Sequence, residues 1–106
     1  MEKECKLIID GSSGSESIEQ DMAELMVKVF EIFKKKQACY GKGNIADFGE
    51  RGVLIRSNDK IKRLIKLVWD GKPNAIPDES IEDTWIDLAD YALIALLVRN
   101  GSWDKI

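Results

Sequence analysis

The chain of 106 residues contains no histidine. That absence excludes Ser-His-Asp triads, Cys-His nucleophiles and the usual zinc sites, which all depend on an imidazole. Cysteine is also scarce, and Cys5 and Cys39 lack a metal-binding spacing. We therefore expect two free thiols in a reducing cytoplasm rather than a disulfide framework.

Long apolar runs are missing as well. The run Leu7–Ile9 is too short for a signal peptide, and the run Tyr91–Val98 is too short to span a bilayer. The net charge of −3 gives no broad attraction to nucleic acid or to an anionic membrane. These absences predict a cytoplasmic protein that contacts neither a membrane nor nucleic acid. Any phosphate binding must then come from a local basic cluster.

The length of the chain allows a single domain, and a core this small gains from self-association. Residues 1–16, which include a Gly/Ser-rich linker at 11–15, are predicted to form a flexible arm or a short strand. Residues 17–106 are predicted to form one helical domain.

Apolar residues recur at helical spacing in three segments, about 17–40, 53–69 and 78–99. Ser17 begins the first segment as part of a capping box, and Asp78 is the expected cap of the third. The pattern predicts an all-α fold, a compact antiparallel bundle of three main helices. The predicted core consists of Leu25, Val29, Leu64, Ile65, Val68, Leu88, Ala92 and Leu96.

The second half of the third segment, Ala92–Val98, is apolar on all sides. A three-helix monomer has too few neighbours to cover such a segment. We therefore expect a homo-oligomer that completes the bundle.

Acidic residues form a stripe on the third segment. Like charges at this spacing repel, and the helix dipole favours only the first turn, so the later acids suggest another role. Carboxylates plus water suit Mg²⁺, or Mn²⁺, without histidine. The stripe consists of Glu79, Asp83, Asp87 and Asp90.

A basic stripe on the second segment could complement these acids: Arg56, Lys60 and Arg63, with Asp59 beside them. Three interpretations stay open at this point. The stripes pair with each other across a helix–helix contact, they hold a metal or a phosphate group, or they form a solvated face.

Residues 36–97 carry a pattern that runs Lys36, Tyr40-Gly41, Asn44, Phe48-Gly49, Gly52-Val53-Leu54-Ile55-Arg56, Asp59-Lys60, Arg63-Leu64, Asp78-Glu79-Ser80-Ile81-Glu82-Asp83-Thr84 and Asp87-Leu88-Ala89-Asp90-Tyr91-Ala92. This pattern resembles the phage and bacterial family called nucleotide modification associated domain, type one. Members of that family usually have asparagine where this chain has Asp90, and an acid where it has Cys39.

Asp87-Leu88-Ala89-Asp90 also resembles the Glu-x-x-Asp element of MazG-like all-α nucleoside triphosphate pyrophosphohydrolases. Those enzymes use Mg²⁺ to hydrolyse a nucleoside triphosphate to a monophosphate and pyrophosphate. Their second motif, Glu-x-x-Glu, is replaced here by Asp59 among basic residues. One cation with a basic phosphate clamp is therefore the more natural expectation.

The resemblance implies roles for the residues of both stripes. Asp59 and Asp87 would be catalytic, and Glu79, Asp83, Asp87 and Asp90 would hold Mg²⁺, with no organic cofactor. The phosphate and the base would be bound by Lys36, Tyr40, Asn44, Arg56, Lys60 and Arg63. For Tyr40 and Asn44, ordinary packing and a turn are the competing interpretations.

Two other functions remain open. The protein could bind or sequester a nucleotide or a signalling nucleotide without cleaving it. It could also be a helical interaction module whose dimer interface is the third helix.

Overall fold

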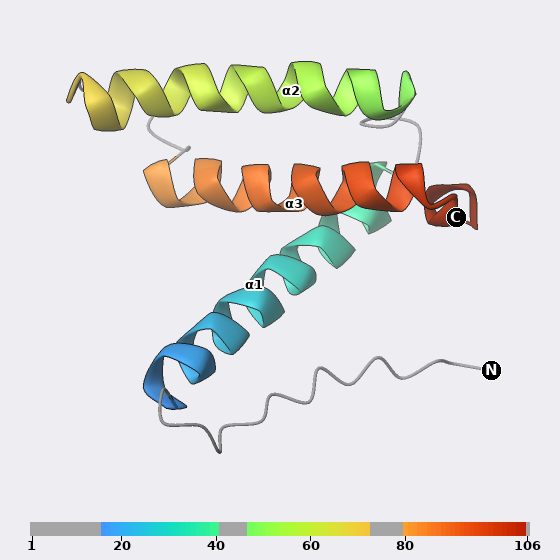
Figure 1. Ribbon diagram of the computed structural model, residues 1–106, viewed down its shortest axis with the longest axis horizontal. Coiled ribbons are helices and arrows are strands. Elements are labelled where there is room, and N and C mark those ends of the chain that lie inside the picture. The colour runs from blue at the N-terminus through green and yellow to red at the C-terminus, as the bar shows by residue number, and fades with distance from the viewer. Residues whose placement is uncertain (1–15, 41–46, 73–79, 106) are drawn as a thin grey trace.

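The computed structural model describes residues 16–40, 47–72 and 80–105. These residues form three long helices, α1 (Glu16–Tyr40), α2 (Gly49–Leu64) and α3 (Ile81–Arg99). Figure 1 shows α2 and α3 side by side in opposite directions, while α1 crosses α3 obliquely. The described residues contain no strand, which confirms an all-α fold of three packed helices. Within these ranges, none of the helices has the length and apolar character that a membrane span requires.

The ends of the helices differ from prediction for local reasons. The structure begins α3 at Ile81 rather than after Asp78, because Ser80 and Asp83 form a reciprocal capping box. The Asp83 amide donates to Ser80 Oγ at 2.9 Å, and the Ser80 amide donates to Asp83 Oδ2 at 3.3 Å. The helix α2 begins at Gly49 rather than at about residue 53. The φ of 65° at Gly49 is a backbone conformation that favours glycine.

Two short turns extend this framework. A π-helical turn, η1 (Ile65–Trp69), continues α2, and a 3-10 turn, η2 (Ser102–Lys105), follows α3. Gly101 has a φ of 80°, so the chain reverses immediately after α3. The reversal brings Trp103 back against the helices.

The core lies where α2, α3 and η2 meet. Val53, Tyr91, Ile94 and Trp103 form one buried cluster, with Phe33 of α1 packed against it. The rings of Phe33 and Trp103 meet edge to face, with centroids 6.3 Å apart. The core therefore joins the end of the chain to all three helices.

Most of the predicted core residues are not buried in the single chain. Leu64 is buried, and Val29 and Leu88 are partly buried. The other predicted core residues are exposed: Leu25, Ile65, Val68, Ala92 and Leu96. Periodicity correctly identified apolar helix faces, but it could not show which of them meet within one chain.

Trp103 gives a direct test of this core. Trp103→Ala should lower the free energy of unfolding by about 3–5 kcal/mol, the usual cost of truncating a buried tryptophan. Trp69 is 86% exposed, so the matched variant Trp69→Ala should change stability by less than about 0.5 kcal/mol. Urea unfolding followed by circular dichroism measures both, and equal effects would contradict the placement of Trp103.

Candidate functional site

The three helices meet at the Asp87 carboxylate of α3. Lys36 of α1 reaches its Oδ1 atom at 2.6 Å, and Lys60 of α2 reaches its Oδ2 atom at 3.0 Å. The side chain of Asp87 is 14% exposed, that of Lys60 21% and that of Lys36 45%. We call Lys36, Lys60 and Asp87 the ionic junction. The predicted pairing between the two stripes is thus present between Asp87 and Lys60.

Arg63 adds a further positive charge on the same side of α2. Its Nε donates to Thr84 Oγ1 at 3.2 Å, and the Thr84 hydroxyl donates to the Ser80 carbonyl at 2.9 Å. Thr84 is fully buried and lies three residues before Asp87 on α3. Arg63 and Lys60, one turn apart on α2, thus contact Thr84 and Asp87, one turn apart on α3, so Arg63 lies along the same helix–helix contact as the ionic junction.

Electrostatics in the ionic junction favour the charged forms. Burial acts to raise the pKa of the Asp87 carboxyl, but the hydrogen bonds and charges of Lys36 and Lys60 outweigh it, and the pKa falls below 3.8. Burial acts to lower the pKa of the Lys36 ammonium, but its bond to Asp87 raises the pKa above 10.5. The Asp87 carboxylate and the Lys36 ammonium are therefore both ionised at neutral pH.

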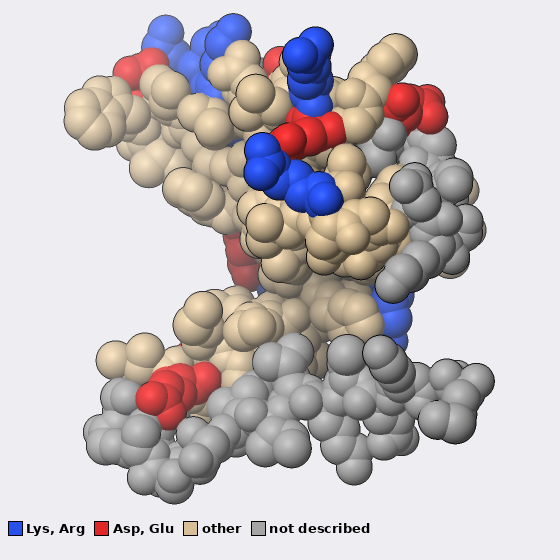
Figure 2. Space-filling model, turned by 45° about the vertical axis from the view of Figure 1, so that its right-hand side comes forward, with Lys and Arg blue, Asp and Glu red and all other residues tan. Residues whose placement is uncertain are grey.

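Charged side chains of both signs lie close together on the surface. Figure 2 shows basic and acidic side chains interleaved on the upper part of the face in view, within a largely uncharged surface. This mixture agrees with the low net charge of the chain.

A groove of about 400 Å³ lies beside the ionic junction, between α2 and α3. Its walls include Ser57, Leu88 and Tyr91, and Arg51 lies at its edge. Ser57 is one helical turn from Lys60, and Tyr91 is one turn from Asp87. The volume falls in the range of small-molecule sites. The sequence does not reveal this groove, because the periodicity of residues along two helices does not show where their packed faces leave space between them.

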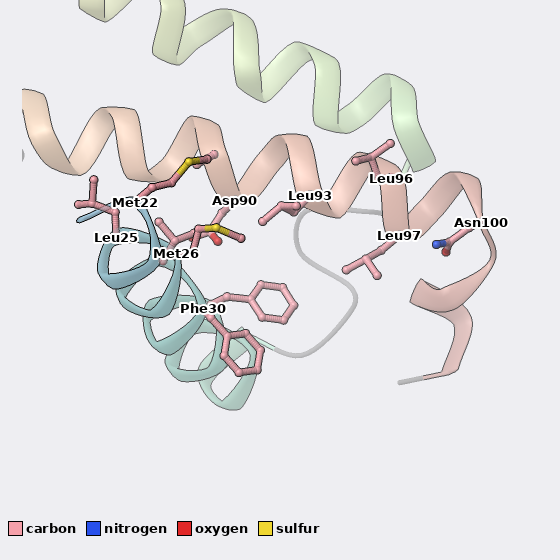
Figure 3. Close-up of a pocket in the computed structure, with 12 residues that line it drawn as sticks. Met22, Leu25, Met26, Phe30, Asp90, Leu93, Leu96, Leu97 and Asn100 are labelled. Atoms are coloured by element: carbon pink, nitrogen blue, oxygen red, sulfur yellow. The ribbon is translucent and has the colours of Figure 1, made fainter. Parts of the chain in front are cut away.

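Asp90 is turned away from this groove. It is 4% exposed and lines a second, larger groove between α1 and α3 (Figure 3). Within the described part of the chain, its Oδ2 has no hydrogen-bond partner. Burial raises the pKa of Asp90 to about 6, Asp87 adds to the rise, and Lys36 opposes it. A buried carboxylate oxygen without a hydrogen-bond donor lowers the stability of the fold. Because Asp90 lines the second groove, it belongs with that groove and not with the ionic junction.

The other predicted site residues are spread out. Asp83 caps α3, and Arg56 and Asp59 are exposed on α2. Glu79 and Asn44 lie outside the described residues, and of Tyr40 only the backbone at the end of α1 is described. The structure thus brings together Lys36, Lys60 and Asp87, with Arg63 along the same contact.

The donor set suits one hard cation better than several. Mg²⁺ takes one or two carboxylates and fills its other positions with water and substrate phosphates. Asp87 offers such a carboxylate where the positive side chains gather. Among the described residues, no group of three or more Asp, Glu, Cys or His side chains is placed to hold a metal ion. Both oxygens of Asp87 are paired with lysines, so a cation could bind there only if the lysines released the carboxylate.

Comparison of the chain with family models, curated proteins and solved structures finds no match. The resemblance to the nucleotide modification associated domain therefore rests on the residues quoted above.

The ionic junction predicts a defined effect on stability. Asp87→Asn should lower the free energy of unfolding by about 2 kcal/mol at pH 7, because it leaves two ammonium groups partly buried without their carboxylate. The pKa of Asp87 is lowered by folding, so its contribution is present above 3.8 and is lost as the pH falls through the folded-state pKa. The difference between wild type and variant should then close in acid.

Urea unfolding at pH 7 and near pH 2 measures this difference. Asp59→Asn, an exposed acid on α2, is the control and should change stability by less than about 0.5 kcal/mol. A destabilisation by Asp87→Asn that persists unchanged in acid would show that the ion pairs are not its cause.

Proposed function

We propose that this protein binds a nucleotide, or a similar phosphate-bearing small molecule, between α2 and α3. One observation carries the proposal: two lysines from two helices converge on one carboxylate beside a groove. Phosphate oxygens are the natural ligands of such a cluster, and Lys binds them as a point charge. The groove along Ser57 and Tyr91 has room for the nucleoside part of the ligand.

Binding on this proposal is an exchange of partners. The ligand's phosphate oxygens would take over Lys36 and Lys60, and Mg²⁺ or Mn²⁺ accompanying the ligand would replace the lysines at Asp87. Arg63 would add charge at the end of the same contact. The exchange conserves charge compensation, because each ammonium group and the carboxylate keep an oppositely charged partner throughout.

A hydrolytic activity would follow from the same arrangement. On the MazG-like resemblance, the protein would convert a nucleoside triphosphate to a monophosphate and pyrophosphate in the cytoplasm of a bacterium or of a phage-infected host. The bound ion would polarise the phosphate and lower the pKa of a coordinated water. Asp87 would hold the ion, and Lys36, Lys60 and Arg63 would neutralise charge that develops on the phosphate oxygens.

Binding without cleavage is the second candidate, and one observation favours it. Asp83, which the resemblance placed in the metal site, is engaged in the capping box with Ser80. A protein that relies on lysines and one aspartate holds a phosphate more readily than it assembles a multi-metal centre.

A panel of nucleoside triphosphates with Mg²⁺ or Mn²⁺ separates the two candidates. Calorimetry measures binding, and chromatography of the products detects monophosphate and pyrophosphate. Lys60→Met should weaken binding at least about tenfold, since it removes a charged contact of roughly 1.4 kcal/mol or more. Lys62→Met, an exposed lysine on the same helix, is the matched control and should bind as wild type.

Binding with product release would establish the enzyme, and binding without products would establish the non-catalytic protein. Failure of the whole panel to bind, or an equal loss in both lysine variants, would refute the nucleotide site.

We also propose that the protein works as a homo-oligomer. Of the α1 side chains described, Ala23 alone is buried, and large apolar side chains of α1 and α3 stay exposed, including Met22, Phe30, Leu93 and Leu96. Apolar faces of this kind mark association surfaces in small domains. Light scattering at micromolar concentration should give at least twice the chain mass of 12.0 kDa, and a 12.0 kDa species would contradict it.

A further inference from the structure

A groove with mostly apolar walls lies between α1 and α3. Its volume is about 600 Å³, and both helices contribute to its walls. Figure 3 shows methionine, leucine and phenylalanine side chains projecting into it from either side. Its polar residues include Asp90 of α3 and Asn100, which caps the C-terminus of α3.

The residues that line this groove follow the spacing of helix bundles. On α1 they include positions 22, 26, 29 and 33, and on α3 and its C-cap positions 89, 93, 96 and 100, with positions 25, 30, 90 and 97 beside them. The first two series each step by four, three and four residues. That heptad spacing is the pattern by which helices insert side chains between those of a partner helix. Within one chain α1 crosses α3 obliquely, so most of both series stays exposed, while Val29 and Phe33 are partly buried (Figure 1).

The two sides of α3 serve different contacts. Tyr91 and Ile94 belong to the core, whereas Leu93 and Leu96 line the groove. At about 100° per residue, the centres of the two sets lie on the order of 160° apart on the helix. A helix that is apolar on two opposite sides needs a second neighbour.

The polar residues of the groove indicate which hydrogen-bonding groups a neighbouring helix must supply. Among the described residues, Asp90 Oδ2 has no hydrogen-bond partner, and an ionised carboxylate can only accept hydrogen bonds. Asn100 Oδ1 accepts from the Ser102 amide at 2.9 Å, which orients the side-chain amide. Its Nδ2 is then directed away from the backbone as a donor.

The spacing of these two residues suits a two-fold axis. Asp90 and Asn100 are ten residues, or about 15 Å, apart along α3, and Leu93, Leu96 and Leu97 lie between them. When two identical helices pack antiparallel about a point near residue 95, position 90 of each lies opposite position 100 of the other. The Asp90 carboxylate of each copy then lies opposite the Asn100 side-chain amide of the other copy.

We propose that this groove is a two-fold interface, in which α3 of a second copy packs antiparallel on α3 and Asp90 of each copy accepts a hydrogen bond from Asn100 of the partner subunit. The inference rests on the proposed homo-oligomer and gives it a surface, a symmetry and a polar contact. The two copies of α1 and α3 together form a four-helix bundle, and the ionic junction and the groove beside it stay outside the interface.

Leu96→Glu tests the surface. Leu96 is 59% exposed in the single chain and lies near the proposed axis, so the charge should convert the dimer to a species of 12.0 kDa. The matched control is Ile55→Glu on α2, where the side chain is 67% exposed and does not line the groove. That variant should remain a dimer. Circular dichroism checks that both variants keep the helical content of wild type.

An exchange of the polar pair tests the contact itself. Asn100→Asp should weaken dimerisation at least about tenfold, because it places two carboxylates against each other. The same change made together with Asp90→Asn should restore the dimer, since amide and carboxylate have only exchanged positions. Asp90→Asn alone completes the cycle, and sedimentation velocity over a concentration series gives the four dissociation constants.

Three results would overturn the interface. Leu96→Glu could stay dimeric, Asn100→Asp could leave the dissociation constant unchanged, or it could weaken dimerisation equally with and without Asp90→Asn. If wild type is a dimer in these cases, the homo-oligomer stands and only this interface falls. A monomeric wild type overturns both, while nucleotide binding, measured separately on the Lys60 and Lys62 variants, is decided independently.

Discussion

All three helices meet at one carboxylate, that of Asp87, and the position of α1 depends on this contact. Beyond it, α1 is tied to the remaining structure by the Phe33–Trp103 ring contact and by an exposed ion pair between Lys28 and Glu82 at 2.8 Å. Exposed ion pairs contribute little to stability. The less exposed Lys36–Asp87 contact and the aromatic contact therefore set where α1 crosses α3, and so set the shape of the groove between them.

The sequence predicts the helices well and their partners poorly. Apolar periodicity identified α1, α2 and α3, because a half-buried helix must repeat apolar residues with its own period. It could not assign the core, because α3 is apolar on two opposite sides and periodicity does not distinguish a face covered by α2 from one left exposed. Leu96 and Ile94 look equally suited to a core, yet Leu96 is 59% exposed and Ile94 is 4% exposed.

The candidate site was predictable in its residue types and only partly in its contacts. Opposite charges on two helices left pairing between the stripes as one of three open interpretations, and the structure shows such a pair between Lys60 and Asp87. The family resemblance pointed to Lys36 as a ligand-binding residue, and its contact with Asp87 was not predicted. The separation of Asp90 from Asp87 was not predictable, because three residues shift a side chain by about 60° around a helix, enough to move it from one contact to the next. The start of α3 was missed for a local reason, since Ser80 with Asp83 satisfies two backbone donors where Asp78 had been expected to cap. The role of Trp103 depends on the reversal at Gly101, for which the Asn100-Gly101 pair is the available sequence signal.

One helix connects the two proposed functional surfaces. α1 carries Lys36 to the ionic junction and forms one wall of the apolar groove. A phosphate ligand that drew Lys36 away from Asp87 would remove one contact between α1 and α3, so it would act on the geometry of the groove as well. Association through the groove would, in turn, hold α1 and thereby the position of Lys36. Because binding linkage is reciprocal, whatever effect the ligand has on the affinity between subunits, association must have to the same degree on the affinity for the ligand. The physical basis of such coupling is the sparse attachment of α1, since an α1 packed over its whole length would respond to neither event.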